Sequence, residues 1–123
     1  MESILMSIKE MLGIAPEYSP FDLQLTMHIN SVFTILKQLG VGPSEGFSIK
    51  DATATWSDFM PDANRIEAVK SYTFMKVKMI FDNVGMSAAV ISAYNEIIKE
   101  LEWRILVEAS QTESTGEEEN QNE

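Results

Sequence analysis

The sequence predicts an all-α fold, a small bundle of four main helices with a long loop between the second and third helices. Apolar residues recur with a helical period in four segments, and glycine, proline and capping residues separate those segments. A chain of 123 residues with 45% hydrophobic residues can bury one core without metal or disulfide support. We therefore expect one helical domain at residues 1–109, followed by a tail at residues 110–123.

The first helix is predicted over residues 2–12, and Gly13 is expected to end it. Its apolar residues occur at offsets that gather on one helical face. They are Ile4, Leu5, Ile8, Met11 and Leu12.

The second helix is predicted over residues 20–39. Ser19 is expected to be its N-cap, Pro20 its first residue and Gly40 its left-handed C-cap. The helical period is kept along this segment by Phe21, Leu25, His28 or Ile29, Val32, Leu36 and Leu39.

Residues 41–62 change character, because glycine, proline and a loose two-residue alternation replace the helical period. A long connection is expected there, with a small hairpin or one helical turn at residues 57–60 as its two alternatives. The third helix should begin at Pro61 or Asp62 and end at Phe81. Apolar residues surround it on nearly every side, so neighbouring elements should cover it. Its main stripe is Ile66, Val69, Thr73, Val77 and Ile80.

The fourth helix is predicted from Ser87, as its cap, to about Glu108. Glu100 and Arg104 are spaced for a surface ion pair. Residues 110–123 hold five glutamates and lack large apolar side chains, so we expect an acidic, disordered tail. The predicted core stripe of the helix is Val90, Tyr94, Ile97 with Ile98, Leu101 and Ile105.

Charge and residue usage exclude several functions. The net charge of −10 disfavours binding to nucleic-acid phosphates. The start of the chain lacks the pattern of an export signal, and Lys76 and Lys78 interrupt the longest apolar-rich region, so neither export nor a membrane span is expected. With no cysteine and one histidine, His28, no metal site, cofactor site or catalytic centre is predicted. Asp58 and Asp62 are interpreted as solvated acids of the loop.

Features of the sequence instead favour protein–protein contact. Trp103 lies off the predicted core stripe and Trp56 lies in the long loop, and aromatic residues in such places are preferred interface anchors. Eight methionines either fill gaps in the core or form an adaptable binding surface. The second alternative corresponds to a small soluble regulatory protein-binding module that captures a helix in a Met-rich groove.

Four stretches of the chain resemble head-tail connector proteins of phages and prophages of Gram-positive bacteria. They are Met27–Pro43, Thr55–Phe59, Tyr72–Asp82 and Ile98–Arg104, and the likeness extends over about residues 3–108.

The resemblance implies a structural virion protein, made in the host cytoplasm and located at the head–tail junction. Such a protein assembles as a ring on the portal protein, carries the next connector or tail-completion protein, and lets the genome pass through without sequence-specific binding. Two alternative surfaces are considered under this hypothesis. The first is the end of the fourth helix with the tail that follows, expected to face the portal through Trp103, Arg104, Leu106 and Val107. The alternative is the loop that carries Trp56 and Phe59, expected to face a neighbouring subunit or the next connector protein.

Overall fold

Five helices make up the part of the chain that the structure, a computed structural model, describes: residues 2–62 and 64–121, with side chains up to Ser110. They are α1 (Ile4–Leu12), α2 (Asp22–Gln38), α3 (Trp56–Phe59), α4 (Ile66–Phe81) and α5 (Ala88–Gln121). Four of them are long, so the predicted all-α bundle is confirmed. Residue 63 of the predicted third helix and residues 122–123 of the predicted tail lie outside the described residues.

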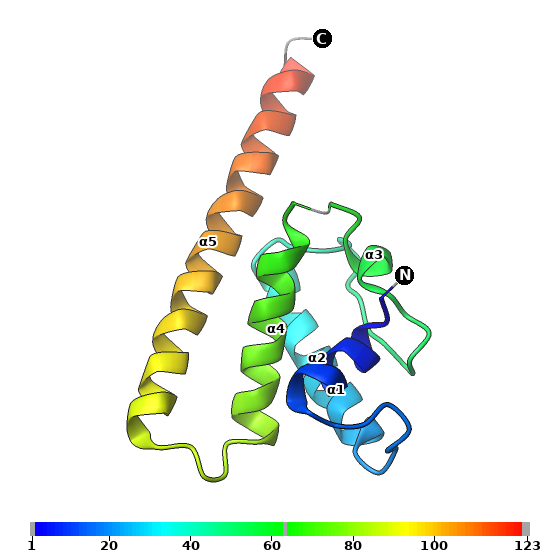
Figure 1. Ribbon diagram of the computed structural model, residues 1–123. Helices are drawn as coiled ribbons and strands as arrows, with labels where there is room; N and C mark the ends of the chain where they lie inside the picture. Colours follow the sequence, from blue (N-terminus) through cyan, green and yellow to red (C-terminus); the bar gives the residue numbers. More distant parts are fainter. Residues whose placement is uncertain (1, 63, 122–123) are drawn as a thin grey trace.

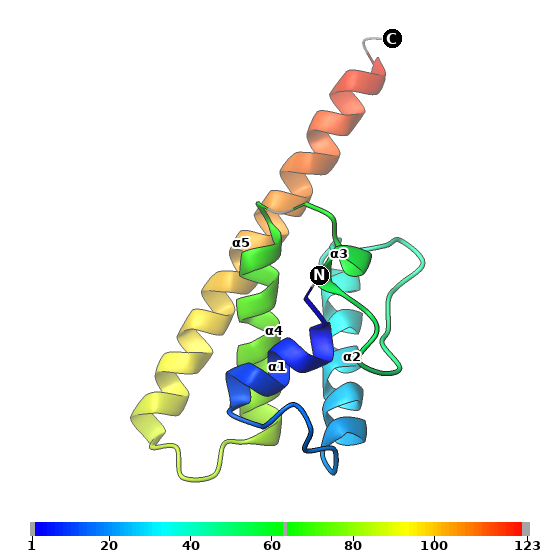
Figure 2. The ribbon, with the colours of Figure 1, turned by 45° about the vertical axis from the view of Figure 1, so that its right-hand side comes forward.

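The helix α4 is central, packed between α2 on one side and α5 on the other. The short α1 lies across α2 and α4, as Figure 1 and Figure 2 show from two directions. The apolar stripe of α4 follows from this position, since Val69, Thr73 and Val77 are buried. Ile80 was predicted to complete the stripe and is 53% exposed, because it lies at the end of α4.

Local capping chemistry determines several of the helix ends, whereas α2 and α4 begin without a side-chain cap. Ser3 Oγ accepts a hydrogen bond from Met6 N at 3.3 Å at the start of α1, and Gly13 closes the helix at φ 79°. Gly40 follows α2 at φ 84°, as predicted. The predicted cap at Ser19 is wrong: residues 19–22 form a turn, and α2 begins at Asp22 without a side-chain cap.

The connection between α2 and α4 is fixed at two points. Asn30 pairs with the backbone of Ile49, its Nδ2 donating to the carbonyl at 3.0 Å and its Oδ1 accepting from the amide at 2.7 Å. Of the two alternatives for this loop, the helical turn is the one formed: α3 is closed by a capping box between Thr55 and Asp58. The only pairing of strand type among the described residues is an isolated bridge between Ser3 and Thr55.

The helix α4 begins at Ile66, four or five residues later than predicted. Asp62 forms a turn there instead, because its carbonyl accepts from the amides of Arg65 and Ile66, and its carboxylate accepts from Asn64 N at 2.9 Å. The predicted end at Phe81 is confirmed.

The helix α5 is longer than predicted and continues to Gln121. Figures 1 and 2 both show its C-terminal part extending past the other helices. Glutamate and glutamine are good helix formers, so a helix that is already nucleated can continue through them without a packing partner. The predicted end at Glu108 is therefore wrong, while the division into a domain and a tail stays a prediction.

Candidate partner-binding surface

The two loop aromatics predicted as anchors, Trp56 and Phe59, lie in the core, and each is 3% exposed. Trp56 Nε1 donates to Ser7 Oγ at 2.8 Å. Phe59 stacks on Phe33 with 4.7 Å between ring centroids, and Phe47 closes the cluster. The expectation that these side chains face a partner is wrong, because the loop folds back over α2 and buries them.

The inner face of α5 packs on α4. Ser87 Oγ caps the helix by accepting from Val90 N at 3.2 Å, as predicted. Ile98 and Ile105 are buried in the contact, whereas Val90 and Ile97 are each 43% exposed. The inner stripe therefore passes through Ile98 rather than Ile97.

The outer face of α5 presents the side chains predicted to bind the portal. Trp103, Leu106 and Val107 are spaced at i, i+3 and i+4, which places them on one face of the helix. Trp103 is 64% exposed and Leu106 is 46% exposed. These three residues form a continuous apolar strip, called here the outer strip, next to the part of α5 that extends past the body.

Arg104 lies beside the outer strip and forms an ion pair along the helix. Its Nη2 lies 2.7 Å from Glu100 Oε1, and both side chains are more than half exposed. The predicted pair is thus present, although such exposed pairs contribute only about 0.3–0.5 kcal/mol. Arg104 remains accessible to a carboxylate of a partner.

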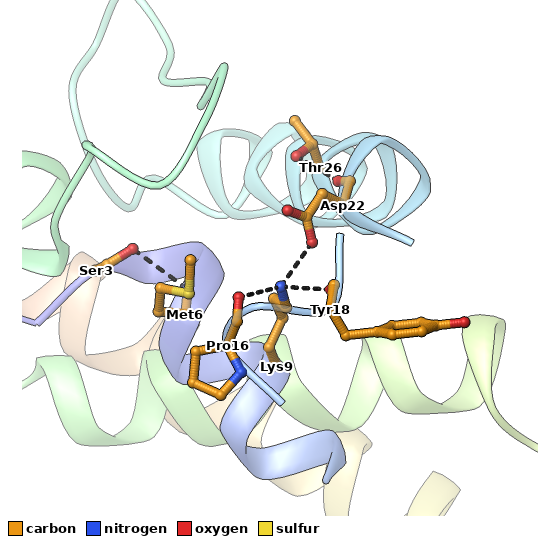
Figure 3. A network of polar contacts seen from close by, with 7 residues as sticks. All are labelled: Ser3, Met6, Lys9, Pro16, Tyr18, Asp22 and Thr26. Atoms are coloured by element: carbon orange, nitrogen blue, oxygen red, sulfur yellow. Dashed lines mark hydrogen bonds and ion pairs between the residues drawn. The ribbon is translucent and has the colours of Figure 1, made fainter. Parts of the chain in front are cut away.

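A second feature, the buried cation of Lys9, had no signal in the sequence. Its side chain is fully buried, and Nζ donates to Pro16 O at 2.9 Å and Tyr18 O at 2.8 Å while pairing with Asp22 Oδ1 at 2.8 Å. Figure 3 shows these contacts converging from the α1–α2 connection and from the start of α2. The buried ammonium group is thereby compensated by two hydrogen bonds and one ion pair.

Exposed aromatics border this network at the end of the bundle away from the extending part of α5. The rings of Tyr18 and Phe21 are 5.5 Å apart, and Phe21 meets Phe81 edge-on at 5.1 Å. His28, which the sequence places on the second helix, is half-buried on α2 with its ring edge-on to Phe81 at 6.4 Å. The Lys9 contacts hold the backbone that carries Tyr18.

The loop acids Asp58 and Asp62 make hydrogen bonds that stabilise the local backbone. A cavity of about 430 Å³ brings Asp58, Asp62 and Arg65 together with Phe59. Both carboxylates accept backbone amide hydrogen bonds, Asp58 in the capping box and Asp62 in the turn before α4. Among the described residues, no group of acids or histidines could hold a metal ion, and no helix is long and apolar enough to span a bilayer.

Two pKa values are shifted where other elements meet α4. Burial raises the pKa of the Tyr72 phenol above its ordinary value of 10.0, and the Glu102 carboxylate of α5 adds to this, although Tyr72 Oη has no hydrogen-bond partner within 3.5 Å among the described residues. The hydrogen bond to Glu2, at 2.8 Å, raises the pKa of Lys70 above 10.5. The second contact ties the start of the chain to α4.

The methionines mostly fill space in the body. Met60 is buried, and Met75 and Met79 pack against the core. Of the seven described methionines, only Met11 and Met27 are exposed, and they lie on different helices. This arrangement favours the gap-filling interpretation over a Met-rich groove.

Comparison with known families decides between the hypotheses. The family model described as "Phage connector protein" matches residues 4–112. The chain belongs to the phage connector protein family. The match covers the whole bundle and the outer strip, so a structural role in the phage particle applies to this fold as a unit. No match was found among curated proteins or among solved structures.

Proposed function

We propose that this connector protein is a head–tail connector subunit of a tailed phage or prophage of Gram-positive bacteria. It assembles as a ring on the portal protein at the head–tail junction and carries the next connector or tail-completion protein. The family match over residues 4–112 carries this proposal, because it assigns the whole bundle to connector proteins.

The portal-binding surface in this proposal is the outer strip with Arg104 and the acidic tail at residues 110–123. An exposed tryptophan beside an exposed leucine is favourable for binding, since aromatic anchors contribute most of the energy of many interfaces. The strip adjoins the extending part of α5, so a partner can reach it without displacing another helix. Residues 1–109 form the connector domain in this division.

The charge of the chain suits passage of the genome. Residues 1–109 carry 14 acids and 9 bases, a net charge of 9 − 14 = −5, and residues 110–123 add five glutamates. A ring of such subunits presents negative charge, which repels DNA phosphates and leaves a passing genome unbound. Sequence-specific DNA contact is not part of the proposed mechanism.

The assembly is tested by the mass of the protein, alone and mixed with a portal protein encoded beside it, using light scattering coupled to size-exclusion chromatography. Ring-sized species, or ring formation that depends on the portal, are expected. A chain that stays monomeric with that portal contradicts the proposal.

The outer strip is tested by Trp103→Ala. Loss of a central tryptophan anchor should weaken portal binding by at least about 30-fold, corresponding to about 2 kcal/mol. Leu23→Ala, at a 75% exposed side chain on α2, is the matched control and should bind as the parent does. Helicity by circular dichroism should be unchanged in both; equal binding by the two variants would remove Trp103 from the interface.

A further inference from the structure

The helix α5 is attached to the body by one narrow face. Among the described elements, α4 is the only one with which it makes an extended contact. Up to Ser110, its buried apolar side chains are Ile98, Ile105 and Ala109. By contrast α2, with 17 residues, buries Leu25, Ile29, Val32, Phe33 and Leu36.

The same contact contains two buried polar atoms without hydrogen bonds to the described residues. One is Tyr72 Oη, which is influenced by the Glu102 carboxylate of α5, and the other is Arg65 Nε, which forms an ion pair with Glu108 Oε2 at 3.8 Å, too far for a hydrogen bond. Buried polar groups are normally paired by close hydrogen bonds. The polar contacts between α5 and α4 are therefore charge contacts without close hydrogen bonds in the free chain.

The connection before α5 allows a change of direction. Residues 82–87 are a short turn in which Val84 is 90% exposed. Gly85 has φ +83°, and no other group lies within 4 Å of where its side chain would be. A short exposed turn with an uncrowded glycine is the type of segment that absorbs backbone rotation at a hinge.

Apolar side chains also occupy the faces of α5 that α4 does not cover. Val90 and Ile97 lie on one flank, and Trp103 and Leu106 lie on the outer side. If α5 moved, another of its apolar faces could therefore be covered when the face that now packs on α4 became exposed.

We propose that α5 is a releasable arm, which leaves α4 by rotation at residues 82–87 when the subunit joins its assembly. Release uncovers Ile98, Ile105 and the Tyr72 side of α4 for contacts in the complex. The role in assembly rests on the proposed connector function, whereas the opening itself is a property of the free chain.

A disulfide between α5 and the body tests the role of release. A Cβ built at Gly40 lies 3.7 Å from Ala109 Cβ, within the usual range of about 3.5–4.5 Å for disulfides, and the chain has no cysteine of its own. The variant Gly40→Cys/Ala109→Cys is compared with itself, oxidised and reduced, because both forms carry the same strain at φ +84°. The reduced form should assemble with the portal, and the oxidised form should do so at least tenfold less. Equal assembly of the two forms would overturn the proposal.

Amide hydrogen exchange on the unmodified free chain provides a test without a partner. A helix that has left α4 loses its packing partner, so its backbone hydrogen bonds open more often. Amides at residues 98–109 of α5 should therefore exchange at least tenfold faster than those at residues 29–36 of α2. Exchange that is equally slow in both segments would overturn the arm. Fast exchange in a chain that fails to assemble, even unmodified, would contradict the connector function and leave the arm standing.

Discussion

The α1–α2 connection and the α4–α5 contact satisfy their polar groups to different degrees. In the first, a fully buried lysine donates two hydrogen bonds and forms one ion pair, each at 2.9 Å or less, and the connection is held at three points. In the second, Tyr72 Oη and Arg65 Nε are buried without close hydrogen bonds to the described residues, Arg65 forms an ion pair at 3.8 Å, and the apolar packing from α5 comes from three buried side chains and the half-buried Leu101. The chain thus fixes one end of the bundle firmly and holds α5 weakly.

The body of the molecule, in contrast to α5, is organised by contacts between segments that are distant in the sequence. Trp56 reaches Ser7 across the chain, and Lys70 reaches Glu2. The outer strip, by comparison, is made by one helix alone. A platform with a fixed body and one adaptable helix is consistent with a protein that must hold its shape and still fit a partner.

Alanine substitution of the two tryptophans should change the free energy of unfolding by very different amounts. Trp56→Ala should lower the free energy of unfolding by about 3–5 kcal/mol, because it leaves a cavity beside Phe33 and removes the donor to Ser7 Oγ. Trp103→Ala should change it by less than about 0.5 kcal/mol, since that side chain is 64% exposed. Urea unfolding followed by circular dichroism measures both without relying on tryptophan fluorescence; similar losses would show that the Trp103 side chain packs within the subunit as Trp56 does.

The next effect tests the firm end directly. Lys9→Met should lower the free energy of unfolding by about 3 kcal/mol, at the low end for a broken buried pair because the Asp22 side chain is 33% exposed. The substitution also leaves the carbonyls of Pro16 and Tyr18 without their donor. Lys50→Met, at an exposed lysine, is the control and should stay within about 0.5 kcal/mol of the parent in the same urea titration. A loss as small as the control's would mean that the network does not hold the connection.

Sequence patterns predicted the parts of the fold that local chemistry determines. The glycines after α1 and α2, the Ser87 cap, the end of α4 at Phe81 and the Glu100–Arg104 pair were all predictable from residues within one helical turn. The start of α4 was not predictable in this way, because aspartate is favoured both as a helix cap and as a turn residue, and the local sequence does not distinguish these roles for Asp62. The stripe of α5 was predicted with Ile97 and Ile98 together, and only the position of α4 shows that Ile98 is the buried one of the two.

Of the residues predicted to bind a partner, those on the helix were found exposed or half-buried and those in the loop were found buried. Trp103 lies within a regular helix, so its distance from the inner stripe could be read from the period. Trp56 and Phe59 lie in an irregular loop, whose periodicity carries no information about burial. Their place in the core depends on Phe33 and Ser7, which are far away in sequence.

Tyr72→Phe tests the α4–α5 contact. Removing a buried hydroxyl without a hydrogen-bond partner should raise the free energy of unfolding by about 1 kcal/mol at neutral pH. Tyr18→Phe removes a hydroxyl from a ring that is 47% exposed and is the control, with a change below about 0.5 kcal/mol. A loss of stability in the Tyr72 variant would mean that the hydroxyl has a partner after all, and that the contact with α5 is better satisfied than its geometry indicates.

Tyr72→Phe should also change how the free energy of unfolding depends on pH in alkaline solution. Burial raises the pKa of Tyr72 above 10.0 in the folded chain, so between the two pKa values the unfolded chain loses a proton that the folded chain retains. The unfolded state is then stabilised, and the free energy of unfolding falls as pH rises above 10. Tyr72→Phe removes this contribution, so its advantage over the parent should grow between about pH 8 and about pH 11 in urea titrations. A constant difference would mean that the phenol titrates alike in both states, which would place it in contact with water and the α4–α5 contact already open.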